Sequence, residues 1–308
     1  MTPTLSRATF LKLLSAAGLS AAAFKISDAM AAKTMRTRAI PKTGEALPVI
    51  GLGTWLGFDV GGSEGERAPL RQALSNMFAG GGTVIDSSPM YGNAEAVTGD
   101  LVHELKLRRK AFFATKVWTS GRQSGIEQMA QSFRYMRTDV MDLMQIHNLL
   151  DWNTHLKTLR AMKDEGKIRY IGITHYTSSA LDDLADVIKS EPIDFVQMAY
   201  SIGVRKAEER LLPIAAEKGV AVLVNRPYEG GDLFGSVRGK KLPPWAAEFD
   251  CASWGQFFLK FILAHPAVSC LIPGTSKPHH LLDNLGAGYG RLPDPAQRAK
   301  MLALFKDL

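Results

Sequence analysis

The sequence predicts an α/β protein, specifically a (β/α)8 (TIM) barrel, and two patterns carry that prediction. Short apolar runs of strand length alternate with segments of helical periodicity along most of the chain. The runs are almost continuously apolar, as is typical of parallel strands covered by helices on their outer face. The chain of 308 residues has the length that such barrels commonly use for a single domain.

Eight apolar runs are the predicted strands, and the segments between them are the predicted helices. The strands are expected in residues 49–55, 82–88, 111–118, 140–147, 168–174, 194–200, 220–226 and 268–274. The helices are expected in 68–79, 94–105, 125–136, 155–165, 178–189, 207–217 and 254–264, with a last amphipathic segment at 295–305. No GxGxxG follows the first strand, which argues against an open dinucleotide-binding sheet.

Two further segments stand outside this alternation. Residues 37–44 precede the first barrel strand and look like one arm of a hairpin, with a Thr-Gly-Glu turn after them. The loop over 227–250 is long and rich in glycine, proline and aromatic residues. Long loops in compact domains are usually functional, so we expect a lid or a cofactor clasp there.

Residues 1–31 have the order of an export signal. The charged start SRATFLK precedes the apolar run LLSAAGLSAAAF and the small-x-small site Ala29–Ala31. The start resembles a twin-arginine signal, although Ala8 stands where the second arginine belongs. We therefore predict a signal peptide at 1–31, a barrel domain at 32–308 and a periplasmic or exported protein that meets the export machinery. The alternative is an amphipathic N-terminal helix on a protein that stays in the cytoplasm.

The charge distribution along the chain indicates which kinds of partner are not expected. Most of the net charge of +7 comes from residues 1–42, so the barrel is close to neutral and no nucleic-acid surface is expected. The apolar run of the leader is too short to span a bilayer, and no membrane partner is predicted after its removal. Cys251 and Cys270 show no metal-ligand spacing. Cys270 is expected in the core, and a disulfide between the two cysteines stays open.

Four residues at the ends of successive predicted strands carry chemistry: Asp86, Tyr91, Lys116 and His147. The carboxyl ends of barrel strands meet on one face, where active sites are built. Each residue alone also has a structural explanation. Asp86 could cap a turn, Tyr91 could be an aromatic at the rim, Lys116 could be a paired lysine and His147 a core histidine. Together, an ammonium beside a phenol, with a carboxylate and an imidazole, predict proton transfer.

The sequence resembles the aldo-keto reductase family over residues 36–306. The segments GLGTW, VIDSSPMYGNAE, FFATKVW, DLMQIHN, IGIT, FVQMAYS and IPGTSKPHHLLDN resemble its signature segments, in order. The resemblance implies a barrel closed at its base by an N-terminal hairpin, and reduction of carbonyls by NADPH without a metal. It implies that Tyr91 is the general acid, that Asp86 holds Lys116, that Lys116 lowers the pKa of Tyr91, and that His147 orients the carbonyl.

The resemblance also implies a set of cofactor-binding positions. They are Gly53, Thr54, Trp55, Thr174, His175, Gln197, Asn225, Arg226, Gly274, Thr275, Ser276, His280 and Asn284. Gln197 is expected to hold the nicotinamide amide, and Asn284 the adenine.

Several of these positions depart from the family pattern. Thr174-His175 replaces a Ser-Asn pair, and Asn225 replaces a tyrosine that stacks on the nicotinamide. Gly274 replaces a lysine and His280 an arginine in the clamp for the 2′-phosphate. NADPH is still the predicted cofactor. Because the lost charge weakens recognition of the 2′-phosphate, NADH is the alternative.

The predicted function is therefore an oxidoreductase that reduces a small-molecule aldehyde, ketone or sugar. The alternative is a barrel without catalysis that binds nicotinamide nucleotide as a sensor or accessory subunit. Phe58, Trp118, Tyr228 and Trp245 are candidates for apolar walls of the substrate site, or for packing residues. Loops build such pockets, so the fold does not name the substrate.

Overall fold

The computed structural model describes residues 34–308. The predicted leader and its boundary at 31/32 lie outside the described residues. Residues Met35–Leu308 form one compact unit. Within residues 34–308, no helix combines the length and the hydropathy needed to cross a membrane.

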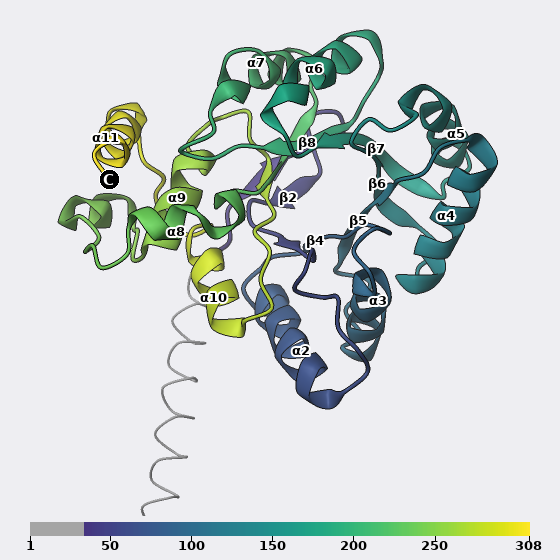
Figure 1. Ribbon diagram of the computed structural model, residues 1–308, viewed down its shortest axis with the longest axis horizontal. Coiled ribbons are helices and arrows are strands. Elements are labelled where there is room, and N and C mark those ends of the chain that lie inside the picture. The colour runs from purple at the N-terminus through teal and green to yellow at the C-terminus, as the bar shows by residue number, and fades with distance from the viewer. Residues whose placement is uncertain (1–33) are drawn as a thin grey trace, which may run out of the picture. The chain divides into compact units, whose positions relative to one another are not determined.

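Eight parallel strands form the barrel, which confirms the predicted fold (Figure 1). They are β3 (Leu52–Gly53), β4 (Val84–Asp86), β5 (Phe112–Val117), β6 (Met141–His147), β7 (Ile168–His175), β8 (Phe195–Ala199), β9 (Ala221–Asn225) and β10 (Cys270–Leu271). Each strand pairs with the next along the chain. Parallel bridges from Ile50 to Leu271 and from Gly53 to Gly274 join the last strand to the first segment and close the ring.

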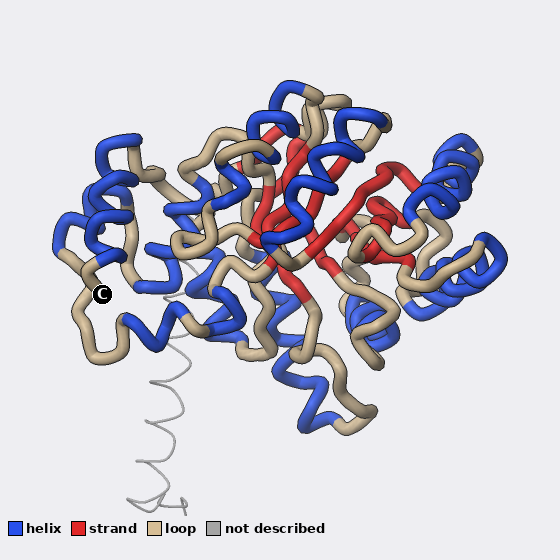
Figure 2. Tube along the Cα trace, turned by 45° about the horizontal axis from the view of Figure 1, so that its top comes forward, coloured by secondary structure: helices blue, strands red, loops and turns tan. Residues whose placement is uncertain are grey.

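Helices surround the strands, as Figure 2 shows with the red strands inside the blue helices. They are α2 (Glu64–Ala79), α3 (Ala94–Glu104), α4 (Arg122–Tyr135), α5 (Trp152–Asp164), α6 (Leu181–Ser190), α7 (Leu211–Glu217), α9 (Trp254–Leu263), α10 (Pro278–Gly286) and α11 (Pro295–Lys306). The predicted loop over 227–250 holds a short helix, α8 (Leu233–Ser236), and two 3-10 turns, Glu229–Gly231 and Pro244–Phe249.

Most helices begin within three residues of the prediction, but three differ more. α7 begins at Leu211 and not at residue 207, after the 3-10 turn Lys206–Glu208. α2 begins at Glu64 and not at residue 68, because its first turn is polar and hydrophobic periodicity does not detect it. The carboxylates of Glu64 and Glu66 in that turn interact favourably with the positive end of the helix dipole. α10 was not predicted at all. It begins with Pro278 in the first turn, where a proline has no backbone bond to lose.

A hairpin precedes the barrel, as predicted. β1 (Thr37–Ala39) pairs antiparallel with β2 (Ala46–Pro48) across a turn that contains Gly44 at a φ of +75°. Ile40 and Leu47 are fully or almost fully buried and join the core cluster formed by inward-facing strand residues. The hairpin therefore closes one end of the barrel with apolar side chains.

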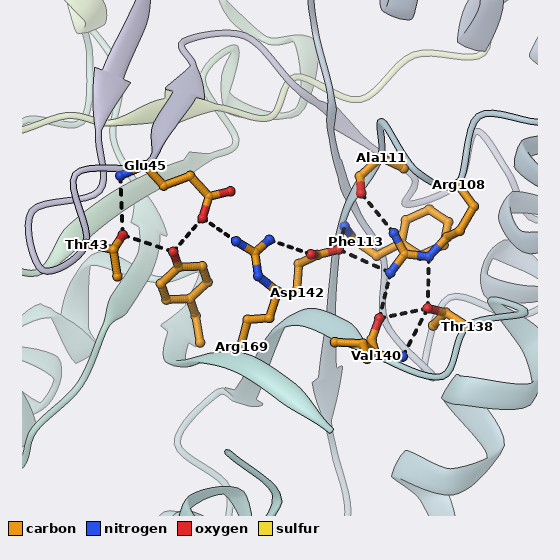
Figure 3. Close-up of polar contacts among 10 residues, drawn as sticks. Thr43, Glu45, Arg108, Ala111, Phe113, Thr138, Val140, Asp142 and Arg169 are labelled. Atoms are coloured by element: carbon orange, nitrogen blue, oxygen red, sulfur yellow. Dashed lines mark hydrogen bonds and ion pairs between the residues drawn. The ribbon is translucent and has the colours of Figure 1, made fainter. Parts of the chain in front are cut away.

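A polar network ties this hairpin to the neighbouring strands (Figure 3). Arg169 of β7 bonds Asp142 of β6 at 2.7 Å and also pairs with Glu45 in the turn of the hairpin. The hydroxyl of Tyr170 donates to Glu45 at 2.6 Å, and Asp142 accepts from the amide of Phe113 at 2.8 Å. These bonds lie at the amino-terminal side of the strands, so the opposite end of the barrel is left open for a site.

Both cysteines are buried and free. Cys270 lies in the barrel core, as predicted, and Cys251 is not its disulfide partner.

Candidate active site

The site is built around a buried ion pair at the carboxyl ends of β4 and β5. The ammonium of Lys116 lies 2.6 Å from Oδ2 of Asp86 and donates to the carbonyl of Ser87 at 2.6 Å. The Lys116 side chain is wholly buried. Burial alone would lower the pKa of Lys116, but Asp86 and then Tyr91 raise it above its usual value. Lys116 is therefore a fixed positive charge inside the barrel.

Tyr91 lies above this charge on the loop after β4. The Lys116 ammonium is 5.2 Å from the centroid of the Tyr91 ring. Burial raises the pKa of Tyr91, and the attraction of Lys116 opposes that rise without cancelling it. Lys116 lowers the pKa of Tyr91, in the predicted direction, but burial is the larger effect and the net shift is upward. The phenol thus holds its proton at neutral pH.

His147 ends β6 and faces the phenol. Its ring meets the Tyr91 ring edge-on, with 6.1 Å between centroids and an angle of 87° between planes. Burial lowers the pKa of His147 to about 3, with further lowering from Lys116 and His175. The imidazole is therefore neutral at physiological pH. Its Nδ1 lies 3.1 Å from Oγ of Ser88.

A network of amides extends from the ion pair across the barrel. Oδ1 of Asp86 accepts from Nε2 of Gln145 at 2.9 Å and from Nε2 of Gln197 at 2.8 Å. Because an ionised carboxylate only accepts, both amides must turn their nitrogens toward Asp86. Oε1 of Gln197 then accepts from Thr174 at 3.2 Å and from Asn225 at 3.3 Å.

Gln197 is thereby saturated with protein partners. Its Nε2 makes a second bond, to Oε1 of Gln145 at 3.1 Å, so that both donors and both acceptor lone pairs are in use. A nicotinamide amide that bound to Gln197 would have to replace one of these bonds. Asn225, the last residue of β9, thus takes part in the network through its side-chain amide.

One cavity of about 1190 Å³ opens at the carboxyl ends of the strands. Fifteen of the predicted site residues line it: Gly53, Thr54, Trp55, Asp86, Tyr91, His147, Thr174, Gln197, Asn225, Arg226, Gly274, Thr275, Ser276, His280 and Asn284. The structure thus brings most of the predicted set together around one space.

Two predicted residues do not line the cavity. Lys116 is wholly buried, and its ammonium contacts Asp86 and faces the Tyr91 ring. His175 is turned aside: its Nδ1 accepts from the amide of Thr177 at 3.2 Å, and its ring stacks on Tyr176 at 5.6 Å. His175 therefore lies behind Tyr176, a residue that lines the cavity.

Part of the cavity wall is apolar and exposed. Trp55, Leu56, Met90, Trp118, Tyr176 and Phe234 line it and are the more exposed large apolar side chains around it. Two of the candidate walls, Trp118 and Tyr228, are confirmed as lining residues. The other two are packing residues: Phe58 is fully buried, and Trp245 packs against Phe249 and Phe257.

Another part of the cavity wall has the chemistry of a nucleotide site. Thr275, Ser276 and Lys277 line it beside α10 and offer hydroxyl and ammonium donors to a phosphate. The backbone is close there, since a Cβ added to Gly57 would lie 3.3 Å from the amide nitrogen of Ser276. Burial, His279 and Lys277 lower the pKa of His280, which disfavours a positive charge on its ring. The donors and the space fit a dinucleotide.

Several lining or supporting residues were not predicted. Gln145 has the clearest sequence signal, since it lies two residues before His147 on β6 and therefore faces the same side. Asp283 carries a charge into the cavity wall and is held by Ser253 at 2.7 Å. Tyr228 donates to Oδ1 of Asn284 at 2.6 Å, a contact between distant segments that only the fold shows. Among residues 34–308, no group of three or more histidine, cysteine or acidic side chains could hold a metal ion.

Comparison with known proteins gives consistent matches. The sequence pattern of the aldo/keto reductase family matches residues 49–296. The chain is 28% identical over 263 residues to methylglyoxal reductase YeaE of Escherichia coli (strain K12), covering 81% of this chain and 89% of that protein. It is 27% identical over 238 residues to the NADH-specific methylglyoxal reductase of the same strain, covering 65% and 70%.

A solved structure shares the fold. The aldo/keto reductase from Klebsiella pneumoniae, crystallised with NADP and acetate, matches with a TM-score of 0.74 at 22% identity, covering 88% of this chain and 95% of that one.

Proposed function

The chain belongs to the aldo/keto reductase family, and on this basis we propose that it reduces the carbonyl group of a small molecule to an alcohol with NADPH. The observation that carries the proposal is the wholly buried Lys116–Asp86 pair beneath a protonated phenol and beside a neutral imidazole, at the floor of one large cavity. When bound, NADPH supplies the hydride.

Tyr91 is the proton donor in this proposal. A phenol is a weak acid, but the negative charge that develops on a carbonyl oxygen during reduction makes the oxygen a strong base. The phenolate that remains lies close to the Lys116 ammonium, which stabilises it in a site shielded from water. Lys116 therefore helps Tyr91 most at the moment when the proton leaves.

His147 orients the substrate. A neutral imidazole can donate one hydrogen bond to the carbonyl oxygen without competing with Tyr91 as an acid. The edge-on arrangement of the two rings lets both groups approach a single oxygen atom from the cavity. Two fixed donors around that oxygen favour the transition state over the ground state.

NADPH is preferred over NADH in this proposal. Lys277, Thr275 and Ser276 are the groups that would bind the 2′-phosphate. The lowered pKa of His280 weakens that clamp, so discrimination against NADH is expected to be modest. The likeness to a relative named as NADH-specific makes NADH the second cofactor to test.

The favoured substrates are uncharged aldehydes or ketones. The exposed part of the cavity wall is formed by uncharged side chains, among them Trp55, Met90 and Trp118. Phosphorylated sugars would lose hydration there without gaining an ion pair. Relatives named as methylglyoxal reductases make small oxo-aldehydes a natural member of a test panel.

The test is carbonyl-dependent oxidation of NADPH and NADH by the purified protein. The panel contains aryl aldehydes, aliphatic ketones, methylglyoxal and free and phosphorylated sugars. We expect turnover with uncharged carbonyls and a higher kcat/KM with NADPH. Tight binding of nucleotide with no turnover across the panel would favour the sensor or accessory role instead.

A further inference from the structure

Ser88 makes a contact with His147 that the proposed mechanism does not yet use. It lies two residues after Asp86, its side chain is wholly buried, and it does not line the cavity. Its Oγ is 3.1 Å from Nδ1 of His147. The other contact of this hydroxyl within the described chain is the amide of Met90, which donates to Oγ at 3.4 Å.

The hydrogen-bonding capacity of these groups decides where the protons lie. A serine hydroxyl has one proton to donate and two lone pairs with which to accept. The Met90 amide can only donate, so within residues 34–308 Nδ1 of His147 is the acceptor in reach of the Ser88 proton. If Nδ1 carried the imidazole proton, the hydroxyl proton would be buried without an acceptor, which is unfavourable. The favoured arrangement has Ser88 donating to an unprotonated Nδ1.

We infer that Ser88 is a positioning residue that holds His147 in the Nε2–H tautomer, so that Nε2 presents a hydrogen-bond donor to the substrate oxygen. A neutral imidazole has one protonated nitrogen, and the hydrogen bond at one nitrogen sets the state of the other. Burial, Lys116 and His175 keep the ring neutral, which is the condition under which this choice exists.

The geometry agrees with this role. His147 lines the cavity, and no described side chain bonds its Nε2, so that nitrogen is available to a ligand. With the other tautomer, the lone pair of Nε2 would face the lone pairs of the carbonyl oxygen and repel them. The inference rests on the proposed carbonyl reduction for its use in catalysis, but the tautomer itself is a property of the protein alone.

The direct test is ¹⁵N NMR of the full-length protein with ¹⁵N-labelled histidine, recorded at neutral pH with and without NADP⁺. A His147→Gln variant assigns the resonances of His147. We expect a pyridine-like shift at Nδ1 and a pyrrole-like shift at Nε2 in the wild type. In Ser88→Ala the two shifts should move toward each other as the tautomers mix, and Ser88→Thr, which keeps the hydroxyl, should restore them.

Kinetics provide the second measurement. Removal of one neutral hydrogen bond predicts a fall in kcat of roughly three- to tenfold in Ser88→Ala, with little change in KM for the nucleotide. Ser269→Ala is the matched control, since Ser269 is also a buried serine and bonds the amide of Val222 away from the cavity. We expect that variant to keep the kcat of the wild type.

Two results would overturn the inference: an Nδ1–H tautomer in the wild type, or an unchanged tautomer in Ser88→Ala. The wild-type spectrum decides the first even if the variants fold poorly. The NMR measurement needs no turnover, so it separates two failures. A protein with the Nε2–H tautomer that reduces no carbonyl would support the role of Ser88 in the tautomer and refute the proposed function.

Discussion

Replacing Lys116 with methionine tests whether the pair beneath the site is a desolvated ion pair. Methionine keeps much of the length and apolar character of the lysine stem and removes the ammonium. Asp86 then remains as a buried charge whose remaining partners are the amides of Gln145 and Gln197. The side chain of Asp86 is 3% exposed, so water cannot replace the lost partner.

The expected loss follows from this burial. Removal of one partner from a buried ion pair destabilises a protein by about 3–5 kcal/mol, because the other charge is left without compensation. A domain of this size shifts its Tm by about 2–4 °C for each kcal/mol, so the expected drop is roughly 6–20 °C. The drop should be largely reversed in the double variant Lys116→Met with Asp86→Asn, since asparagine removes the orphaned charge and keeps an acceptor for the two glutamines.

The assay is urea and thermal unfolding followed by circular dichroism, with the wild type, both variants and a surface control. Lys189→Met serves as the control, because Lys189 is exposed on α6 and its loss should be nearly neutral. A Lys116→Met protein within about 1 kcal/mol of the wild type would refute the ion-pair reasoning. So would a double variant that is no more stable than Lys116→Met.

Three other predictions follow from the site and the chain ends. The pKa of His147 is about 3 in the folded protein, below its usual value of 6.5. As the pH falls below 6.5, the imidazole is therefore protonated in the unfolded chain but not in the folded one, and the folded protein loses stability. Between pH 7 and pH 5 the wild type should lose about 2 kcal/mol more of its free energy of unfolding than His147→Gln, as measured by urea unfolding. If the free energy of unfolding fell equally with pH in both proteins, the prediction would be contradicted. Lys277→Met should raise the Kd for NADPH roughly tenfold and leave the Kd for NADH unchanged, as measured by tryptophan fluorescence. Lys189→Met is again the control, and equal weakening of both nucleotides would exclude a contact with the 2′-phosphate. Finally, we propose that the leader is removed on export, so mass spectrometry of protein from its native cell should show a mature start near Ala32, and an intact Met1 would contradict the signal.

The strands and the polar side chains at their ends could be predicted from the sequence because their signals are local. Each strand is a short apolar run, and a charged or polar residue at its end stands out against that run. Lys116 at the end of an apolar strand implied a buried partner, and the partner is Asp86. Barrel topology then places the ends of neighbouring strands together without further information.

The contacts that tune the site could not be predicted, because they depend on packing between distant segments. The net pKa of Tyr91 depends on how much of the phenol the assembled barrel covers, and no sequence pattern gives that amount. The saturation of Gln197 requires four partners from four strands to converge. The stacking of the His175 ring on the neighbouring Tyr176 likewise depends on side-chain packing that the sequence does not show.

The central claim is that Tyr91 donates the proton in a carbonyl reduction, and a Tyr91→Phe variant tests it most directly. The measurement compares kcat/KM for the best carbonyl of the panel with the Kd for NADPH in the same protein. Tyr135→Phe is the control, since Tyr135 is an exposed tyrosine on the surface of α4. We predict that Tyr91→Phe lowers kcat/KM by about 10²–10⁴-fold and leaves the Kd unchanged, because general acid catalysis contributes about that much. Turnover within a few-fold of the wild type would contradict the assignment of Tyr91 as the acid.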